Sequence, residues 1–236
     1  MLEVEAIDTY RGRAQILRQV SFSVGEKEAV CLVGRNGAGK TTTIDSIIGL
    51  LPLRSGKITF QGVDISSLPP YKRARLGIGY APEDSGIFPD LTVAENFQIC
   101  RWLAQSSGRA AQAAETDERV SALFPEVREL SQRQGLHLSG GQKKMVAIAR
   151  AMMLSPAILL LDEPFEGLAP VVVTRLVEAV KKIKELKISV LIAESNLANA
   201  SRVADRLYAI DRGEIIYGGD PRLVVENQEV MNTIRG

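Results

Sequence analysis

Short apolar segments separated by glycine and other turn residues open the sequence. Residues 2–33 alternate between apolar and polar positions and are broken at Gly12 and Gly25, which predicts several short β-strands. The last of these, "EAVCLV", is apolar throughout, as is typical of a parallel strand buried on both faces. Two further short strands are predicted, in "GKITFQG" at 56–62 and in "LGIGYAPED", which ends in a proline-containing loop.

Helical periodicity dominates the middle of the chain, and strands alternate with helices after it. Residues from about 91 to 154 are predicted to be mostly helical, with the polar stretch 105–118 as a mobile surface segment. The strands "AILLLD", "ISVLIA" and "RLYAID" then alternate with helices at 170 to about 186 and near 197–204. A hairpin joins "RLYAID" to "EIIYGG" through the turn signal "DRGE". This alternation predicts an α/β fold with a mostly parallel sheet covered by helices.

Composition narrows the class of protein only slightly. The 236 residues suffice for one large or two small domains, and the formal net charge of +1 argues against nucleic acid as the main partner. Cys31 lies inside an apolar run and is predicted to be a buried core residue. The N-terminus lacks a signal-peptide pattern, and no apolar run is long enough to span a bilayer, so we expect an intracellular, soluble protein. Four lysines are predicted to form a solvated helix face: Lys181, Lys182, Lys184 and Lys187.

The segment "GRNGAGKT", Gly34 to Thr41, predicts a phosphate-binding loop. Glycines allow backbone N–H groups to turn towards phosphate oxygens, and the N-terminus of the following helix adds partial positive charge. Lys40 can then reach the β- and γ-phosphates, and the Thr41 hydroxyl can bind Mg²⁺. The alternative is a chance glycine-rich turn, which the preceding strand and following helix disfavour.

A second half of the same site is predicted in "AILLLDEP". The buried strand ends in Asp162, whose carboxylate is placed near a Mg²⁺ ion, and Glu163 can orient or deprotonate a water aimed at the γ-phosphate. Taken alone, two acids at the end of an apolar run also fit an ordinary strand end. Downstream of a phosphate loop they favour an ATP-hydrolysing site.

The segment "LSGGQ", residues 138–142, resembles the signature of the ATP-binding cassette (ABC) superfamily. The resemblance covers nearly the whole chain and implies one ABC ATPase domain over residues 1–236, with a RecA-like P-loop NTPase core and a mostly parallel sheet. It also implies an N-terminal antiparallel β subdomain (1–30 and about 56–75) and an inserted α-helical subdomain (about 90–155). Two such subunits would form two composite ATP sites at their interface.

The resemblance also assigns roles to individual residues. Tyr10, ahead of "QVSFSV", would stack on adenine, although one aromatic on an N-terminal strand is often only core. Glu163 would be the catalytic base, with Glu83 and Ser195 beside it, and Mg²⁺ would be held by Thr41, Asp162 and Glu83. The signature residues would act on ATP bound by the second subunit: Ser139, Gly140, Gly141 and Gln142. The phosphates would be bound by Gly34, Asn36, Gly37, Ala38, Gly39, Lys40, Thr41 and Thr42.

Departures from the superfamily pattern point to one branch. Glu83 stands where a glutamine is usual, Ala169 where an aspartate is usual, and Ser195 where the switch histidine is usual. Together with "GLAP" and "ESN" these resemble the ATPases of branched-chain amino acid importers, the LivF-like group. "DISSLPPYKRARLGIGY" also resembles the ATPase of the lipopolysaccharide exporter, which is the alternative.

The LivF-like resemblance implies an ATPase bound peripherally to the cytoplasmic face of a bacterial inner membrane. Its partners would be two transmembrane permease subunits, a second ABC ATPase in a hetero- or homodimer and, indirectly, a periplasmic solute-binding protein. Phe88, Leu91 and the helices after them would receive the permease. The alternative is that these apolar residues only complete the helical core.

Three other functions compete with the importer hypothesis. A P-loop phosphotransferase would leave "LSGGQ" without a role, and ABC ATPases of translation or DNA repair usually need two cassettes or a long insertion. A cassette that binds ATP without hydrolysing it is disfavoured by Glu163 but kept open by Ser195. His137, the only histidine, precedes "LSGGQ" and is predicted to be a partly exposed turn residue that cannot replace the switch histidine. We therefore expect a slow but active ATPase.

Overall fold

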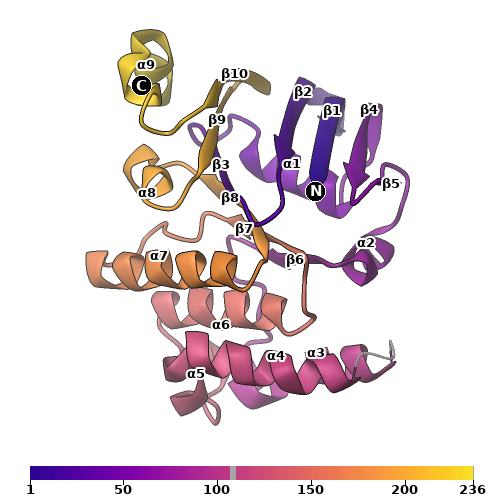
Figure 1. Ribbon diagram of the computed structural model, residues 1–236, viewed down its shortest axis with the longest axis vertical. Helices are drawn as coiled ribbons and strands as arrows, with labels where there is room; N and C mark the ends of the chain where they lie inside the picture. The colour runs from indigo at the N-terminus through magenta and orange to yellow at the C-terminus, as the bar shows by residue number, and fades with distance from the viewer. Residues whose placement is uncertain (107–109, 236) are drawn as a thin grey trace.

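The computed structural model describes residues 1–106 and 110–235, which form two β-sheets and two layers of helices around them (Figure 1). The predicted mobile segment 105–118 falls partly on residues 107–109, which lie outside the described residues, and residues 110–118 are helical. Among the described residues no helix is both long and apolar enough to cross a membrane.

The larger sheet has six strands in the order β10-β9-β3-β8-β7-β6. The five strands from β9 to β6 are parallel, and β10 pairs antiparallel with β9, which confirms the mostly parallel sheet and the terminal hairpin. The strands are β3 (Ala29–Val33), β6 (Ile78–Ala81), β7 (Ile158–Asp162), β8 (Ser189–Glu194), β9 (Arg206–Asp211) and β10 (Glu214–Gly219).

A smaller antiparallel sheet has the order β2-β1-β4-β5, with β1 (Leu2–Arg11), β2 (Ala14–Val24), β4 (Leu53–Phe60) and β5 (Val63–Asp64). The breaks predicted at Gly12 and Gly25 are confirmed, but β1 and β2 are longer than the short strands expected. Strand β4 begins at Leu53 instead of residue 56, because pairing with β1 reaches back to the Thr9–Leu53 register. Local composition around Ser55 and Gly56 does not show this pairing.

The helices follow the predicted order, and their bounds differ only at the ends. The short helices α2 and α9 were not expected from periodicity. The described helices are α1 (Lys40–Ile48), α2 (Pro70–Leu76), α3 (Val93–Ser106), α4 (Ala110–Leu123), α5 (Pro125–Glu129), α6 (Gly140–Met152), α7 (Pro170–Glu185), α8 (Leu197–Ser201) and α9 (Gln228–Arg235), with 3₁₀ turns η1 (Gly135–His137) and η2 (Val224–Glu226).

Side chains along the central strands point alternately to the two faces of the larger sheet, so the hydrophobic core consists of two clusters. In β3, Cys31 and its alternate neighbours face a cluster formed with helices α3 to α7, whereas Val30 and Leu32 face α1 and the smaller sheet. Cys31 is therefore a fully buried core residue, as predicted. One face of α7 is apolar and buried, and it includes Val173, Leu176, Val177, Val180 and Ile183. The central strands of the sheet are thus covered on both faces (Figure 1).

Candidate functional site

The loop between β3 and α1 is shaped by glycines at positions that other residues fit poorly. Gly37 and Gly39 have φ angles of 85° and 115°, in the left-handed region that side chains disfavour. A Cβ on Gly34 would lie 2.3 Å from the carbonyl oxygen of Ile210. Gly39 is the N-cap of α1 and has no side chain that could cap the helix. The N–H groups of the first turn therefore remain for an outside acceptor, which suits an anion.

Lys40 is buried at the start of α1 and is held by three oxygen atoms. Its Nζ donates to the carbonyl oxygens of Gly34, at 2.7 Å, and Arg35, at 3.2 Å. The same nitrogen lies 3.0 Å from Glu163 Oε1 in an ion pair whose side chains are only 5% and 4% exposed. This oxygen accepts no hydrogen bond among the described residues, so the contact with Lys40 is purely ionic. Glu163, from the loop after β7, thus neutralises the charge of Lys40.

Asp162 and Thr41 form a pair of oxygen ligands at the carboxyl end of β7. Thr41 Oγ1 donates to Asp162 Oδ1 at 3.3 Å, while no donor in the described part of the chain reaches the buried Oδ2. Burial raises the pKa of Asp162 to about 6, and the neighbouring carboxylates of Glu163 and Glu83 add to this against the Thr41 hydrogen bond. An unpaired buried carboxylate oxygen beside a hydroxyl is a suitable donor set for Mg²⁺. The residues present therefore fit the ion that their sequence pattern predicts.

Ser195 contacts the carboxylate of Glu163. Both its backbone nitrogen and its Oγ donate to Glu163 Oε2, at 3.0 Å and 3.1 Å. Glu163 has a φ of 46°, and its own N–H donates to the carbonyl of Ala193 on β8. Ser195 also lines a separate cavity of about 440 Å³ together with Glu194 and Asn196. Ser195 is therefore hydrogen-bonded to the candidate base, Glu163.

A cavity of about 470 Å³ lies over the phosphate loop. Eight predicted site residues line it: Asn36, Gly37, Gly39, Lys40, Thr41, Thr42, Glu83 and Glu163. Gly34, Ala38 and Asp162 are buried and do not line it. Sequence reasoning missed Arg11, Ile16 and Glu166, which also line it.

Arg11 donates through Nε to Thr42 Oγ1 at 3.2 Å and forms an ion pair with Asp45. Its place next to Tyr10 on β1 was the only signal that could have indicated it.

Tyr10 lies in a neighbouring cavity instead of the cavity over the phosphate loop. It lines a space of about 910 Å³ together with Arg13, Arg54 and residues 51–53, and its side chain is 38% exposed. Arg11 lines both cavities and so marks where they adjoin. The contact of Tyr10 with a base therefore stays a prediction.

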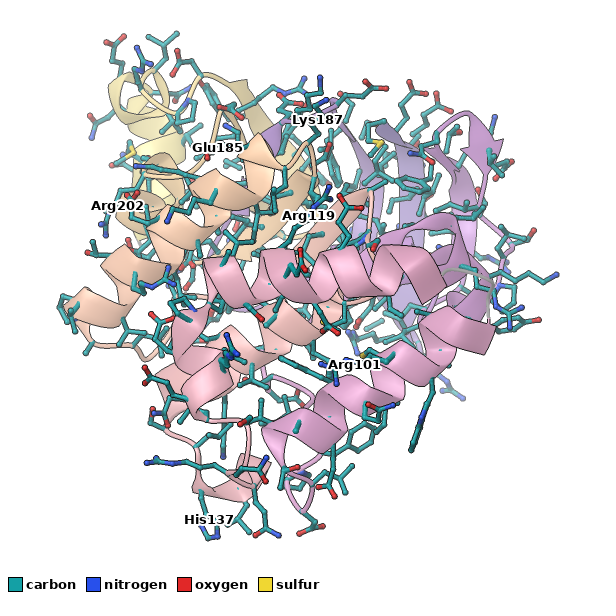
Figure 2. All side chains as sticks on the ribbon, turned by 60° about the horizontal axis from the view of Figure 1, so that its bottom comes forward. Arg101, Arg119, His137, Glu185, Lys187 and Arg202 are labelled. Atoms are coloured by element: carbon teal, nitrogen blue, oxygen red, sulfur yellow. The ribbon has the colours of Figure 1, made fainter. Side chains whose placement is uncertain are left out.

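The signature segment opens α6 away from the phosphate loop of the same chain. Ser139 caps the helix: its Oγ accepts from the Gln142 N–H at 3.3 Å, and Gln142 Oε1 accepts from the Ser139 N–H at 2.9 Å. Ser139 and Gly140 are exposed, and neither they nor Gly141 line the cavity over the phosphate loop. Their action on a second subunit's nucleotide stays a prediction. His137 is exposed at the edge of the molecule, as Figure 2 shows.

Glu194 gives the stability of the protein a testable pH dependence. Burial raises its pKa to about 7 from 4.5, and Glu163 adds to this against hydrogen bonding from Asn196 N. The folded state therefore binds this proton more tightly than the unfolded state does. The resulting stabilisation is complete below about pH 4.5 and is lost as the pH rises towards 7.

We expect Glu194→Gln, which can still accept from the Asn196 N–H, to lose this part of the pH dependence. Its free energy of unfolding relative to wild type should rise between pH 5 and 7 and level off above, measured by urea denaturation without nucleotide or Mg²⁺. Exposed Glu118→Gln is the control and should track wild type. If the free energy of unfolding of wild type and Glu194→Gln changed in parallel with pH, the raised pKa of Glu194 would be contradicted.

Comparison with known proteins gives consistent similarities over the whole chain. The sequence profile of the family described as "ABC transporter" matches residues 17–166. The high-affinity branched-chain amino acid transport ATP-binding protein BraG of Pseudomonas aeruginosa is 33% identical, covering 100% of both chains. The lipopolysaccharide export system ATP-binding protein LptB of Escherichia coli is 34% identical, covering 96% of this chain and 93% of LptB. A crystal structure of the ADP conformation of an ABC transporter's ATP-binding cassette superposes with a TM-score of 0.87 at 27% identity, covering 100% and 98% of the two chains.

Proposed function

The chain belongs to the ABC transporter family of ATP-binding subunits, and from this premise we propose that it drives a branched-chain amino acid importer. The similarity to BraG covers both chains fully, but the similarity to LptB is equally strong. Sequence identity therefore does not distinguish an importer from an exporter. The polar residues around Glu163 favour the importer. Ser195 and Glu194 stand in the "ESN" segment, which resembles importer ATPases, and Ser195 hydrogen-bonds the candidate base.

The arrangement supports a direct sequence of steps for ATP hydrolysis. The glycine loop and the first turn of α1 bind the phosphates, and Lys40 moves from Glu163 to the β- and γ-phosphates. Mg²⁺, held by Thr41 and Asp162, would neutralise phosphate charge when bound. Once released from Lys40, Glu163 accepts a proton from the water, whose oxygen bonds to the γ-phosphorus as the bond to ADP breaks and ADP leaves. Ser195 meanwhile holds the other carboxylate oxygen. We propose that the exposed Ser139 cap contacts the ATP of a second ABC ATPase subunit.

Exposed apolar residues that follow Glu83 in the chain support the proposed contact with a permease. Phe88 is 48% exposed, although its backbone is fixed by the fully buried Asn96, which accepts from the Phe88 N–H at 2.9 Å. The guanidinium of Arg150 lies 5.6 Å from the centre of the Phe88 ring. Trp102 and Leu103 on α3 are 60% and 52% exposed. We propose that this apolar surface binds permease subunits, which would hold the ATPase at the cytoplasmic face of the inner membrane, with a periplasmic binding protein on the other side.

The experiment that tests the import proposal uses the complete transporter. The complex isolated from membranes through a tag on this chain is placed in proteoliposomes containing ATP, with its binding protein outside. We expect uptake of labelled leucine, isoleucine or valine, together with amino-acid-dependent phosphate release. ATP hydrolysis stimulated instead by lipopolysaccharide, with no amino acid uptake, would support the exporter alternative.

Ser195→Ala should slow hydrolysis only modestly, because the backbone N–H of residue 195 still donates to Glu163. Loss of one hydrogen bond to a charged group costs about 1.5–3 kcal/mol, or roughly ten- to a hundredfold in rate if the whole loss appears in the transition state. Steady-state phosphate release from the transporter measures this, and Ser201→Ala on α8 is the matched control. A rate loss above about a hundredfold would mean that Ser195 acts directly on the reacting groups.

A further inference from the structure

Lys144 is a buried lysine on α6 to which the sequence analysis gave no role. Its side chain is 9% exposed, and it does not line the cavity over the phosphate loop. Its Nζ donates to two main-chain carbonyl oxygens, those of Glu83 and Glu163, each at 2.7 Å. These carbonyls belong to the two loops that follow β6 and β7. One ammonium group therefore joins three segments that lie far apart in the sequence.

The contact with Glu163 fixes the main chain of the candidate base. Glu163 has a φ of 46°, a left-handed conformation that residues with a Cβ disfavour, so its neighbours must stabilise it. Its N–H donates to the Ala193 carbonyl at 2.9 Å, and its own carbonyl accepts from Lys144. With both peptide groups held, the side chain is directed towards Lys40 and Ser195. Lys144 thus positions the Glu163 carboxylate indirectly, through a hydrogen bond to the Glu163 main chain.

The contact with Glu83 fixes a second wall of the same cavity. The Glu83 side chain is exposed and lines the cavity over the phosphate loop, while its carbonyl is tied to α6. Further along this loop, Arg150 of the same helix lies over the Phe88 ring. Helix α6 therefore contacts the loop at two points, and its first turn is the exposed signature segment that begins with the Ser139 cap.

Four carboxylates surround the buried ammonium of Lys144. Burial lowers the pKa of Lys144, and the carboxylates of Glu83, Glu166, Asp162 and Glu163 counteract it. A buried donor satisfied by two carbonyls in different loops constrains their relative placement, because moving either loop would leave the other contact strained or the ammonium unpaired. An apolar side chain of the same length would fill the space without this constraint.

We propose that Lys144 is a positioning residue for ATP hydrolysis, which holds the Glu163 main chain and the Glu83 loop in register with the signature helix. This inference rests on the proposed ATPase function. Because Lys144 lies outside the cavity over the phosphate loop, its loss should affect the catalytic rate and leave nucleotide affinity nearly unchanged. A lysine that only supported folding would change stability without separating kcat from KM.

The test compares Lys144→Met and Lys144→Arg in the transporter complex isolated through a tag on this chain. Methionine keeps the apolar length but has no donor, whereas two N–H groups of an arginine can reach both carbonyls. We expect Lys144→Met to lower kcat for phosphate release at least about tenfold, with KM for ATP within about threefold, and Lys144→Arg to recover at least about a third of the wild-type kcat. Lys143→Met, at the half-exposed neighbouring position, is the matched control and should match wild type.

Thermal unfolding of each variant separates a positioning role from loss of structure. A folded Lys144→Met protein with wild-type kcat would overturn the inference, as would a matching loss in kcat and ATP affinity that arginine does not restore. If Lys144→Met does not fold, Lys144→Gln replaces it, and a wild-type kcat in that variant would also overturn the inference. Failure of the wild-type complex to hydrolyse ATP would refute the proposed function itself and is seen before any variant is compared.

Discussion

Lys40→Ala is expected to weaken ATP binding by at least about thirtyfold. Lys40 is the buried cation at the base of the cavity over the phosphate loop, and the phosphates would replace Glu163 and two carbonyls as its partners. Removing one partner of a buried charge pair at a binding site costs about 2–5 kcal/mol, which corresponds to roughly thirtyfold or more in the dissociation constant. Isothermal titration with ATP and Mg²⁺ measures the loss directly.

Arg35→Ala provides the control for this experiment. Arg35 lies in the same loop and loses the same charge, but its side chain is exposed and does not line the cavity. Its ATP affinity should stay within about threefold of wild type, since a surface charge contributes about 1 kcal/mol or less. Wild-type affinity in Lys40→Ala, with Arg35→Ala unchanged, would mean that nucleotide binds elsewhere.

Much of the phosphate-binding loop could be predicted from sequence because its determinants are local. An apolar run of five residues favours a buried strand, and glycines at Gly37 and Gly39 permit positive φ angles that few other residues adopt. A helix follows at once, so strand, loop and helix lie within one short segment. The apolar face of α7 was predictable for the same reason, since its period is contained in the helix itself.

Contacts between distant segments were not predictable in this way. Lys144 lies 19 positions before Glu163, and its contact with the Glu163 carbonyl depends on how α6 packs against β7. Arg11 reaches Thr42 across 31 positions, because β1 lies beside α1 in the folded chain. Ser195 could be placed at the switch position by resemblance, but its partner, Glu163, is visible only in the structure. Residue type does not determine such pairs, since the same lysine or arginine in another packing would face solvent.

The ion pair between Lys40 and Glu163 connects binding and hydrolysis in one site. The Lys40 ammonium pairs with one oxygen of the Glu163 carboxylate, and Ser195 donates to the other. In the mechanism that we propose, phosphate displaces Glu163 from Lys40, and this displacement frees the carboxylate to accept a proton.

Glu163→Gln should separate these two roles of the site. The amide keeps the shape of glutamate and its oxygen still accepts from the Ser195 N–H, but it cannot accept a proton from water and no longer competes for Lys40 with a full charge. We expect phosphate release to fall by about a hundred- to ten-thousandfold, the usual contribution of a general base, while ATP affinity stays equal or increases. Glu178→Gln, on the exposed side of α7, is the matched control.

The same variant should also trap ATP between two subunits, because the nucleotide is bound but not cleaved. Size-exclusion chromatography with ATP and Mg²⁺ is expected to show a dimer for Glu163→Gln and predominantly monomer for wild type, with the partner ATPase added if the pair is heteromeric. A variant that hydrolyses at the wild-type rate would refute Glu163 as the base. Loss of hydrolysis with only monomer present, even with the partner ATPase, would keep that role and refute the composite site, because the exposed Ser139 cap would then lack the second nucleotide it is proposed to bind.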